Sequence, residues 1–272
     1  MSSSSAPLVV AHRGASGELA EHTLGAYELA LRHGADALEC DVRLTRDGHL
    51  VCVHDRRVDR TSTGRGVVSE MTLRGLAELD FASWYDPLPD NADALVTDAP
   101  ASREPAPPNM LTLSQLLELV VDSGRPDAKL FVETKHPVRY GGLVEAKLLA
   151  ELHRFGVAAP PSTADARVAM MSFSPSAVWR VSRSAPMLPT VLLGRTPAAV
   201  ATITAGTVGA TAIGPGIALL RADPTMVQRA AEQGRATYTW TVDTVEDALF
   251  CRDLGVRWLA TNHPQRMRHW LS

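Results

Sequence analysis

Short apolar runs alternate with longer segments of mixed polarity through most of the chain. Runs of this kind are typical of buried strands in an α/β protein. We therefore expect eight strands, in this order: Leu8–Ala11, Ala37–Leu44, Lys129–Thr134, Val168–Phe173, Thr190–Leu193, Thr211–Ile213, Thr237–Val242 and Trp258–Ala260.

The segments between these runs repeat apolar residues at helical spacing. Candidate helices occupy Thr23–Arg32, Leu113–Val121, Leu143–Arg154, Ala198–Ala205, Thr225–Glu232 and Val245–Leu254. Eight strands with interleaved helices predict a single domain over residues 1–272, folded as a (β/α)8 TIM barrel. A doubly wound open sheet is the alternative, because the sixth strand is weakly marked.

The alternation is interrupted after the second predicted strand. The dipeptide Asp47-Gly48 separates that strand from a second β-like run, Leu50–His54, which predicts a hairpin. Residues 59–110 then lack steady periodicity and are rich in Pro, Asp, Gly and Ser, with a short helical stretch near Leu73–Leu79. A segment of this length inside a compact domain is usually functional. We expect a small inserted subdomain at about residues 56–110.

Composition and charge narrow the class of protein. The formal net charge is −3 and like charges form no block, which argues against nucleic-acid binding. Any attraction for an anionic substrate must therefore be local. Three scattered cysteines, Cys40, Cys52 and Cys251, indicate reduced residues instead of a disulfide framework. The Ser-rich start has no basic region and no apolar run is long enough to span a bilayer, so we expect a cytoplasmic protein.

Three carboxylates lie at the ends of two predicted strands. Glu39 and Asp41 are two residues apart, so they share one face about 6.5–7 Å from each other, and Glu133 ends the third barrel strand. Like charges inside a barrel are costly without a cation to neutralise them. An oxygen-rich set without a His/Cys cluster favours Mg²⁺ or Ca²⁺. The alternative is that salt bridges neutralise these carboxylates without a metal. Arg13 or Arg43 would then balance Glu39 and Asp41, and Lys135 would pair with Glu133.

Two histidines and two positively charged side chains, those of Arg13 and Lys135, also lie at the ends of predicted strands. His12 and Arg13 end the first strand, and His54 ends the return strand of the hairpin. A histidine can accept or donate a proton near neutral pH, so the pair could serve both sides of a phosphate ester cleavage. Lys135 could bind a phosphate oxygen as a point charge. Alternatively, His12 only caps the strand and Arg13 is an ordinary surface residue.

Trp240 lies near the end of the seventh predicted strand. Its indole could pack within the barrel, or it could lie beside the glycerol or alcohol group of a substrate. The sequence leaves both interpretations open.

Together these pieces resemble the glycerophosphodiester phosphodiesterase family, and most of all its cytoplasmic actinobacterial members. The matching motifs occur in the family's order from residue 8 to about residue 264. They are His12-Arg13-Gly14, Glu21-His22-Thr23, Glu39-Cys40-Asp41-Val42, His54-Asp55, Asp59-Arg60-Thr61, Glu133-Thr134-Lys135 and Trp240-Thr241-Val242-Asp243. One departure is His22, because the family has Asn at this place in an E-N-T box.

The resemblance implies a role for each group. Glu39, Asp41 and Glu133 would hold the divalent metal, while His12 and His54 would be the general acid and base. Arg13 and Lys135 would bind the phosphate, and the insertion would cover the glycerol side of the pocket. Family enzymes release sn-glycerol 3-phosphate and an alcohol, after attack on phosphorus by the glycerol 2-hydroxyl or by water.

The modest, polar insertion predicts a small glycerophosphodiester substrate, such as glycerophosphocholine or glycerophosphoethanolamine. A lysophospholipase D-like activity is an alternative, but it needs an apolar entry, for which the insertion offers only Phe81, Trp84 and Tyr85. A barrel that binds phosphorylated ligands without turnover is a third possibility, and it predicts the loss of a histidine or a carboxylate. Nothing in the sequence marks an oligomer interface.

Overall fold

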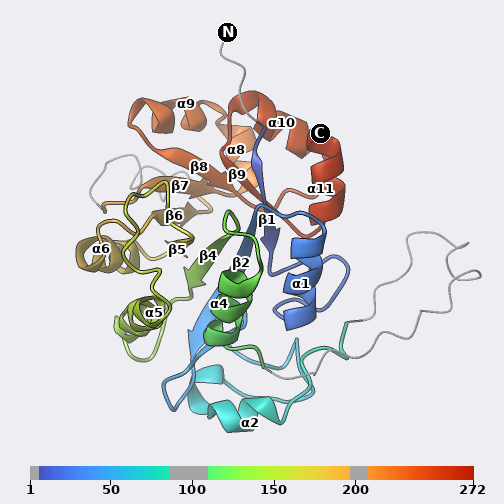
Figure 1. Cartoon of the computed structure of the whole chain (residues 1–272), viewed down its shortest axis with the longest axis vertical. Helices are drawn as coiled ribbons and strands as arrows, with labels where there is room; N and C mark the ends of the chain where they lie inside the picture. The colour runs from blue at the N-terminus through green and yellow to red at the C-terminus, as the bar shows by residue number, and fades with distance from the viewer. Residues whose placement is uncertain (1–5, 86–109, 197–207) are drawn as a thin grey trace, which may run out of the picture.

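The computed structural model describes residues 6–85, 110–196 and 208–272. Eight parallel strands form a barrel with helices around it (Figure 1). The strands are β1 (Leu8–His12), β2 (Ala37–Leu44), β4 (Lys129–Thr134), β5 (Val168–Ser172), β6 (Thr190–Gly194), β7 (Ala212–Pro215), β8 (Ala236–Thr239) and β9 (Trp258–Thr261). β1 pairs with both β2 and β9, which closes the sheet. The TIM barrel is confirmed, and the open sheet is wrong.

The predicted strands differ from the observed ones mainly at their ends. The seventh predicted strand ran to Val242, but β8 ends at Thr239, and Trp240 makes only an isolated bridge to Gly216. The hairpin's return strand, β3 (Leu50–Cys52), ends before His54. β3 pairs antiparallel with β2, as the Asp47-Gly48 signal predicts. Both differences place a polar or aromatic residue of interest on a loop just beyond a strand.

The helices lie on the outside of the barrel (Figure 1). In the described residues they are α1 (Leu24–Arg32), α2 (Leu73–Ala77), α4 (Leu113–Asp122), α5 (Leu143–Arg154), α6 (Pro175–Ser184), α8 (Ile217–Ala222), α9 (Thr225–Glu232), α10 (Val245–Leu254) and α11 (Pro264–Leu271). Thr23, Thr112, Ser174 and Thr244 cap their helices through side-chain oxygens, which is why these helices begin where they do.

The sequence missed three helices, and one predicted helix lies outside the described residues. The sequence analysis did not predict α6, α8 or α11. Helix α8 is short, and α6 and α11 are polar on average. α6 and α11 both begin with Pro at the first turn, a recognisable start signal. The predicted Ala198–Ala205 helix falls among residues that the structure does not describe. No described helix has the length and apolar composition that crossing a bilayer requires.

Side chains point alternately outward and inward along each strand, which gives two apolar cores, one between barrel and helices and one inside the barrel. Leu38 and Cys40 of β2 pack outward against the helices, in the large core between barrel and helices. Ala37 points inward and joins Phe131, Tyr238 and other residues that fill the barrel interior. Glu39 and Asp41 follow Ala37 on the same inward face, because side chains alternate along a strand. The barrel interior therefore changes from apolar to acidic toward the carboxyl ends of the strands.

The described part of the insertion has a small core of its own. Val58, Val68, Leu76 and Phe81 pack with Val51 and Val53 from the hairpin and with Met110. The 3-10 turn η1 (Val68–Glu70) contacts β2, which ties the insertion to the barrel. The insertion is thus held beside the ends of β2 and β3, near His54. Residues 86–109 of the predicted insertion lie outside the described residues.

Candidate active site

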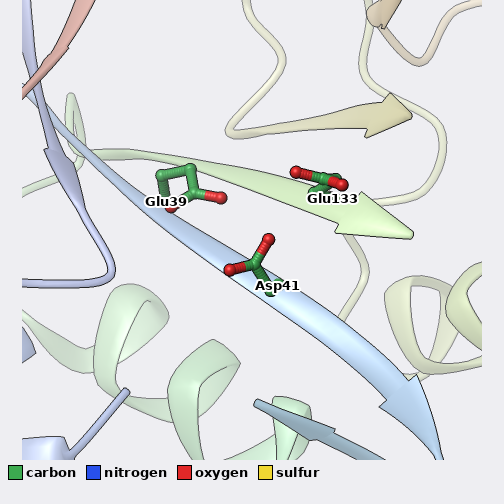
Figure 2. Close-up of side chains that lie close together, drawn as sticks. All are labelled: Glu39, Asp41 and Glu133. Carbon is green, nitrogen blue, oxygen red and sulfur yellow. The ribbon is translucent and has the colours of Figure 1, made fainter. Parts of the chain in front are cut away.

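Three buried carboxylates meet at the carboxyl ends of β2 and β4. Glu39, Asp41 and Glu133 are exposed by only 2%, 0% and 6%. Asp41 and Glu133 are direct partners in the β2–β4 register. Each residue offers an oxygen atom within 4.8 Å of the others, and Figure 2 shows the three carboxylates around one space. The structure thus brings together the three residues that the sequence predicted as metal ligands.

Burial and mutual repulsion control the protons of this cluster. Burial and the neighbouring Asp41 raise the pKa of Glu39 and raise that of Glu133 to about 8. Burial opposes ionisation of Asp41 as well, but Lys135, His22 and Arg13 bring its pKa well below the usual range. Near neutral pH the cluster alone therefore retains protons, which a divalent cation would displace.

The donor set fits a hard divalent cation. All three ligands are carboxylates, which suit Mg²⁺ or Ca²⁺ better than zinc. Asp41 Oδ1 is buried and makes no hydrogen bond of regular geometry, although Lys135 Nζ lies 2.9 Å away. A buried carboxylate oxygen in this state is a position that a cation can fill.

Both predicted phosphate-binding cations contact the carboxylates. Lys135 Nζ lies 2.9 Å from Asp41 Oδ1 and 2.8 Å from Glu133 Oε1. Arg13 Nε lies 3.0 Å from Asp41 Oδ2, and the Arg13 backbone N–H donates to Glu39. The salt bridges foreseen as an alternative are therefore present. Both cations also line the recess, and phosphate binding by them stays a prediction.

His12 is held by a chain of hydrogen bonds from the end of β9. Asn262 donates through Nδ2 to Asp243 at 2.6 Å, so its Oδ1 accepts from His12 Nδ1 at 2.8 Å. This arrangement places the proton of the neutral ring on Nδ1 and leaves Nε2 with a free lone pair. Burial and the Arg13 charge lower the pKa of His12 to about 4.

His54, on the loop after β3, has the same arrangement. Its Nδ1 lies 2.7 Å from Asp55 Oδ1, and Arg60 binds the other oxygen of Asp55 at 2.7 Å. Burial lowers the pKa of His54, and the Asp41 charge partly offsets the effect. The Asp55 contact again assigns the proton of a neutral ring to Nδ1 and leaves Nε2 free. His12 and His54 line one recess together with Glu39, Glu133 and Lys135.

Trp240 packs in the barrel, as one of the two interpretations expects, while contact with a substrate stays a prediction. Its indole donates to the Gly214 carbonyl oxygen at 3.0 Å and packs edge-on against Phe173, with ring centroids 5.4 Å apart. It also lines the recess. Arg195, which the sequence did not single out, lies 5.1 Å from both the Phe173 and Trp240 rings. A polar residue directly after β6 was the signal that could have identified it.

The sequence flagged His22 as a departure but gave it no role. In the structure His22 is buried, its φ is 60°, and its Nε2 lies 3.0 Å from Asp41 Oδ2. Its Nδ1 lies 2.8 Å from the Tyr27 hydroxyl, which itself donates to the Glu39 carbonyl oxygen at 3.0 Å. His22 thus connects helix α1 to both carboxylate residues of β2.

Comparison with known proteins shows the family of the chain. Residues 12–266 match the sequence model of the "Glycerophosphoryl diester phosphodiesterase family". A Mycobacterium tuberculosis protein named "Probable glycerophosphodiester phosphodiesterase 1" is 57% identical over 98% of this chain and 93% of that protein. A Bacillus subtilis "Glycerophosphodiester phosphodiesterase" is 34% identical over 94% of this chain and 84% of its own length.

Solved structures show the same fold. A structure from Silicibacter pomeroyi, described as that of a glycerophosphoryl diester phosphodiesterase without an established activity, superposes with a TM-score of 0.79 at 25% identity. The match covers 98% of this chain and 93% of the other. An Oleispira antarctica phosphodiesterase, solved in complex with sn-glycerol-3-phosphate, has a TM-score of 0.77 at 21% identity, covering 97% and 96%.

Proposed function

This chain belongs to the glycerophosphoryl diester phosphodiesterase family and is a phosphodiesterase, and on that premise we propose its substrates and its mechanism. It hydrolyses small glycerophosphodiesters, such as glycerophosphocholine and glycerophosphoethanolamine, to sn-glycerol 3-phosphate and an alcohol. One observation carries the proposal: Glu39 and Glu133, which cluster with buried Asp41, line a single recess together with His12 and His54. The sn-glycerol-3-phosphate bound by the Oleispira antarctica protein supports the product class.

Glu39, Asp41 and Glu133 would hold a divalent cation, Mg²⁺ or Ca²⁺. When bound, the cation neutralises the carboxylates and polarises the phosphoryl group. Lys135 and Arg13 would bind the phosphate oxygens. Arg13 also has a second acid partner, Glu21, at 3.2 Å, which helps to keep its guanidinium in place.

The two histidines divide the proton transfers. One Nε2 removes the proton from the attacking hydroxyl, either of water or of the glycerol 2-position, as its oxygen bonds to phosphorus. The other histidine, in its doubly protonated form, gives its Nε2 proton to the alcohol oxygen as the second P–O bond breaks. Where the glycerol 2-hydroxyl attacks, water then opens the resulting cyclic phosphate to sn-glycerol 3-phosphate. The lowered pKa of His12, about 4, supports it as the acceptor, because it is unprotonated near neutral pH.

A lysophospholipase D-like activity is less well supported. Of the three aromatic residues that could form an apolar entry, Phe81 is buried in the core of the insertion. Trp84 is partly buried, and its indole donates to the Phe81 carbonyl oxygen.

A product assay tests the proposal. Enzyme stripped with EDTA should be inactive, and Mg²⁺ or Ca²⁺ should restore release of sn-glycerol 3-phosphate from glycerophosphocholine. Lysophosphatidylcholine, assayed in parallel, should be a poor substrate. Full activity after exhaustive chelation would refute the metal requirement, and preference for the lysolipid would favour the alternative.

A further inference from the structure

A positively charged cleft lies beside the active-site recess, and we call it the arginine cleft. Its volume is about 440 Å³. One wall comes from the insertion, with Arg56 and Glu70, and the other from the loop after β4, with Arg139 and Tyr140. Arg43, from the end of β2, also lines it. None of these five residues belongs to the proposed catalytic or metal-binding set.

The charge of the cleft is unbalanced. Arg43, Arg56 and Arg139 face a single acidic lining residue, Glu70, which leaves an excess of two positive charges. In the described parts of the chain none of the three arginines forms an ion pair, and Arg139 only stacks on Tyr140, with Cζ 5.6 Å from the ring centre. This local excess contrasts with the formal net charge of −3 of the whole chain.

Residues that line the arginine cleft are bonded to, or follow closely in the chain, residues that line the catalytic recess. Arg43 donates from Nε and Nη2 to the His54 carbonyl oxygen, at 3.0 and 2.8 Å. Arg56 follows His54 by two residues, and Pro137 of the cleft follows Lys135 by two residues. A ligand whose phosphodiester lies in the recess can therefore extend one arm toward the arginines.

We propose that the arginine cleft binds a second anionic group, a phosphate monoester, on one arm of the glycerophosphodiester. This inference rests on the proposed function and specifies its substrate class: diesters that carry a phosphate beyond the scissile one. Two exposed, unpaired guanidinium groups match a phosphate dianion in charge and can bind its oxygens in bidentate fashion. The cleft volume is sufficient, because ligand sites start at about 300 Å³.

Two substrates that differ by one group test the inference. They are glycerophosphoglycerol and the same diester with a phosphate on one terminal hydroxyl. Wild-type kcat/KM should be about tenfold or more higher for the phosphorylated diester, because charge-assisted hydrogen bonds are strong and 1.4 kcal/mol is a factor of ten. Arg56→Gln/Arg139→Gln should remove that preference and leave turnover of glycerophosphoglycerol within about twofold.

Arg74→Gln is the matched control, since Arg74 is an exposed insertion residue outside the cleft. It should keep the preference. Equal losses for both diesters in the double variant would mean that the arginines only attract the scissile phosphate, and a wild type without preference would also overturn the inference. If wild type hydrolyses neither diester, the proposed function fails. In that case, calorimetry can still measure the binding of each diester to wild type and to the Arg56→Gln/Arg139→Gln variant. Tighter binding of the phosphorylated diester to wild type alone would show that the cleft holds the extra phosphate.

Discussion

Two histidines line the recess with the same hydrogen-bonding arrangement, although His12 ends strand β1 and His54 lies on the loop after β3. In each case Nδ1 is bound by an oxygen that is itself anchored, by Asp243 through Asn262 for His12 and by Arg60 through Asp55 for His54. A fixed Nδ1 orients the ring and keeps Nε2 as the reactive nitrogen. The sequence could identify both histidines by their positions after strands. It could not identify Asn262, which is 250 residues from His12.

Replacing His54 tests the proton-transfer role. His54→Ala should lower kcat for glycerophosphocholine by roughly 10²–10⁴-fold, the usual contribution of a general acid or base. The thermal midpoint should change little, because the side chain is half-buried on a loop. His153→Ala, an exposed residue of α5, is the control and should behave as wild type. Unchanged turnover by the His54 variant would remove His54 from the mechanism.

Replacing His22 tests whether it positions the metal ligands. His22→Phe keeps an aromatic ring, slightly larger than imidazole, but removes the contacts to Asp41 and Tyr27. Under the proposed metal requirement, affinity for Mg²⁺ or Ca²⁺ should fall about 10–100-fold, as when the partners of ligands are removed. Calorimetric titration with the metal alone measures this directly.

Tyr27→Phe is the comparison for the His22 variant, because it keeps the His22–Asp41 contact and removes only the hydroxyl that connects His22 to the Glu39 carbonyl oxygen. Its effect on metal affinity should be smaller. A His22 variant with a lower thermal midpoint but wild-type metal binding would show that His22 has only a packing role.

At the scale of elements, the loop after β1 brings α1 close to the metal ligands. Gly14 has a φ of +85°, and a Cβ there would lie 2.7–2.9 Å from the Ala26 carbonyl group and side chain. Ala26 belongs to α1, and its neighbour Tyr27 bonds the Glu39 carbonyl oxygen. The glycine of the His12-Arg13-Gly14 motif is therefore required by close packing as well as by backbone conformation.

Gly14→Ala should accordingly destabilise the protein more than an alanine at an unhindered left-handed glycine. We expect a loss of about 3 kcal/mol, from roughly 1–2 for the left-handed conformation and the rest from overpacking. Gly156→Ala is the control, with a φ of +70° and nothing within 4 Å of the added Cβ. Urea unfolding measures both. Equal losses would mean that the contact with α1 relaxes at little cost.

At the scale of the whole molecule, the insertion and the barrel have separate cores. Leu76 packs within the insertion, whereas Leu148 of α5 packs in the core between barrel and helices, and both are fully buried. Hydrogen exchange often shows such units opening independently. The insertion supplies Arg56 and Glu70 to the arginine cleft, so its opening would change that site without unfolding the barrel.

Leu76→Ala should therefore raise hydrogen exchange across residues 56–81 while barrel strands stay protected. The local loss should be about 2–5 kcal/mol, the usual cost of truncating a buried leucine. Leu148→Ala should instead lower the stability of the barrel as a whole. If Leu76→Ala lowers protection evenly through both regions, the insertion and the barrel unfold as one unit.

The sequence by itself determined the strands, their order and the inward faces that carry Glu39, Asp41 and Glu133. It could do so because side-chain alternation and apolar runs are local properties of the chain. Only the tertiary structure decided which strand ends meet: Asp41 lies opposite Glu133 by register, and Lys135 lies between them. It also decided the contacts of His22 and the assembly of the arginine cleft. Those depend on barrel closure and on the docking of the insertion, which join residues far apart in the sequence.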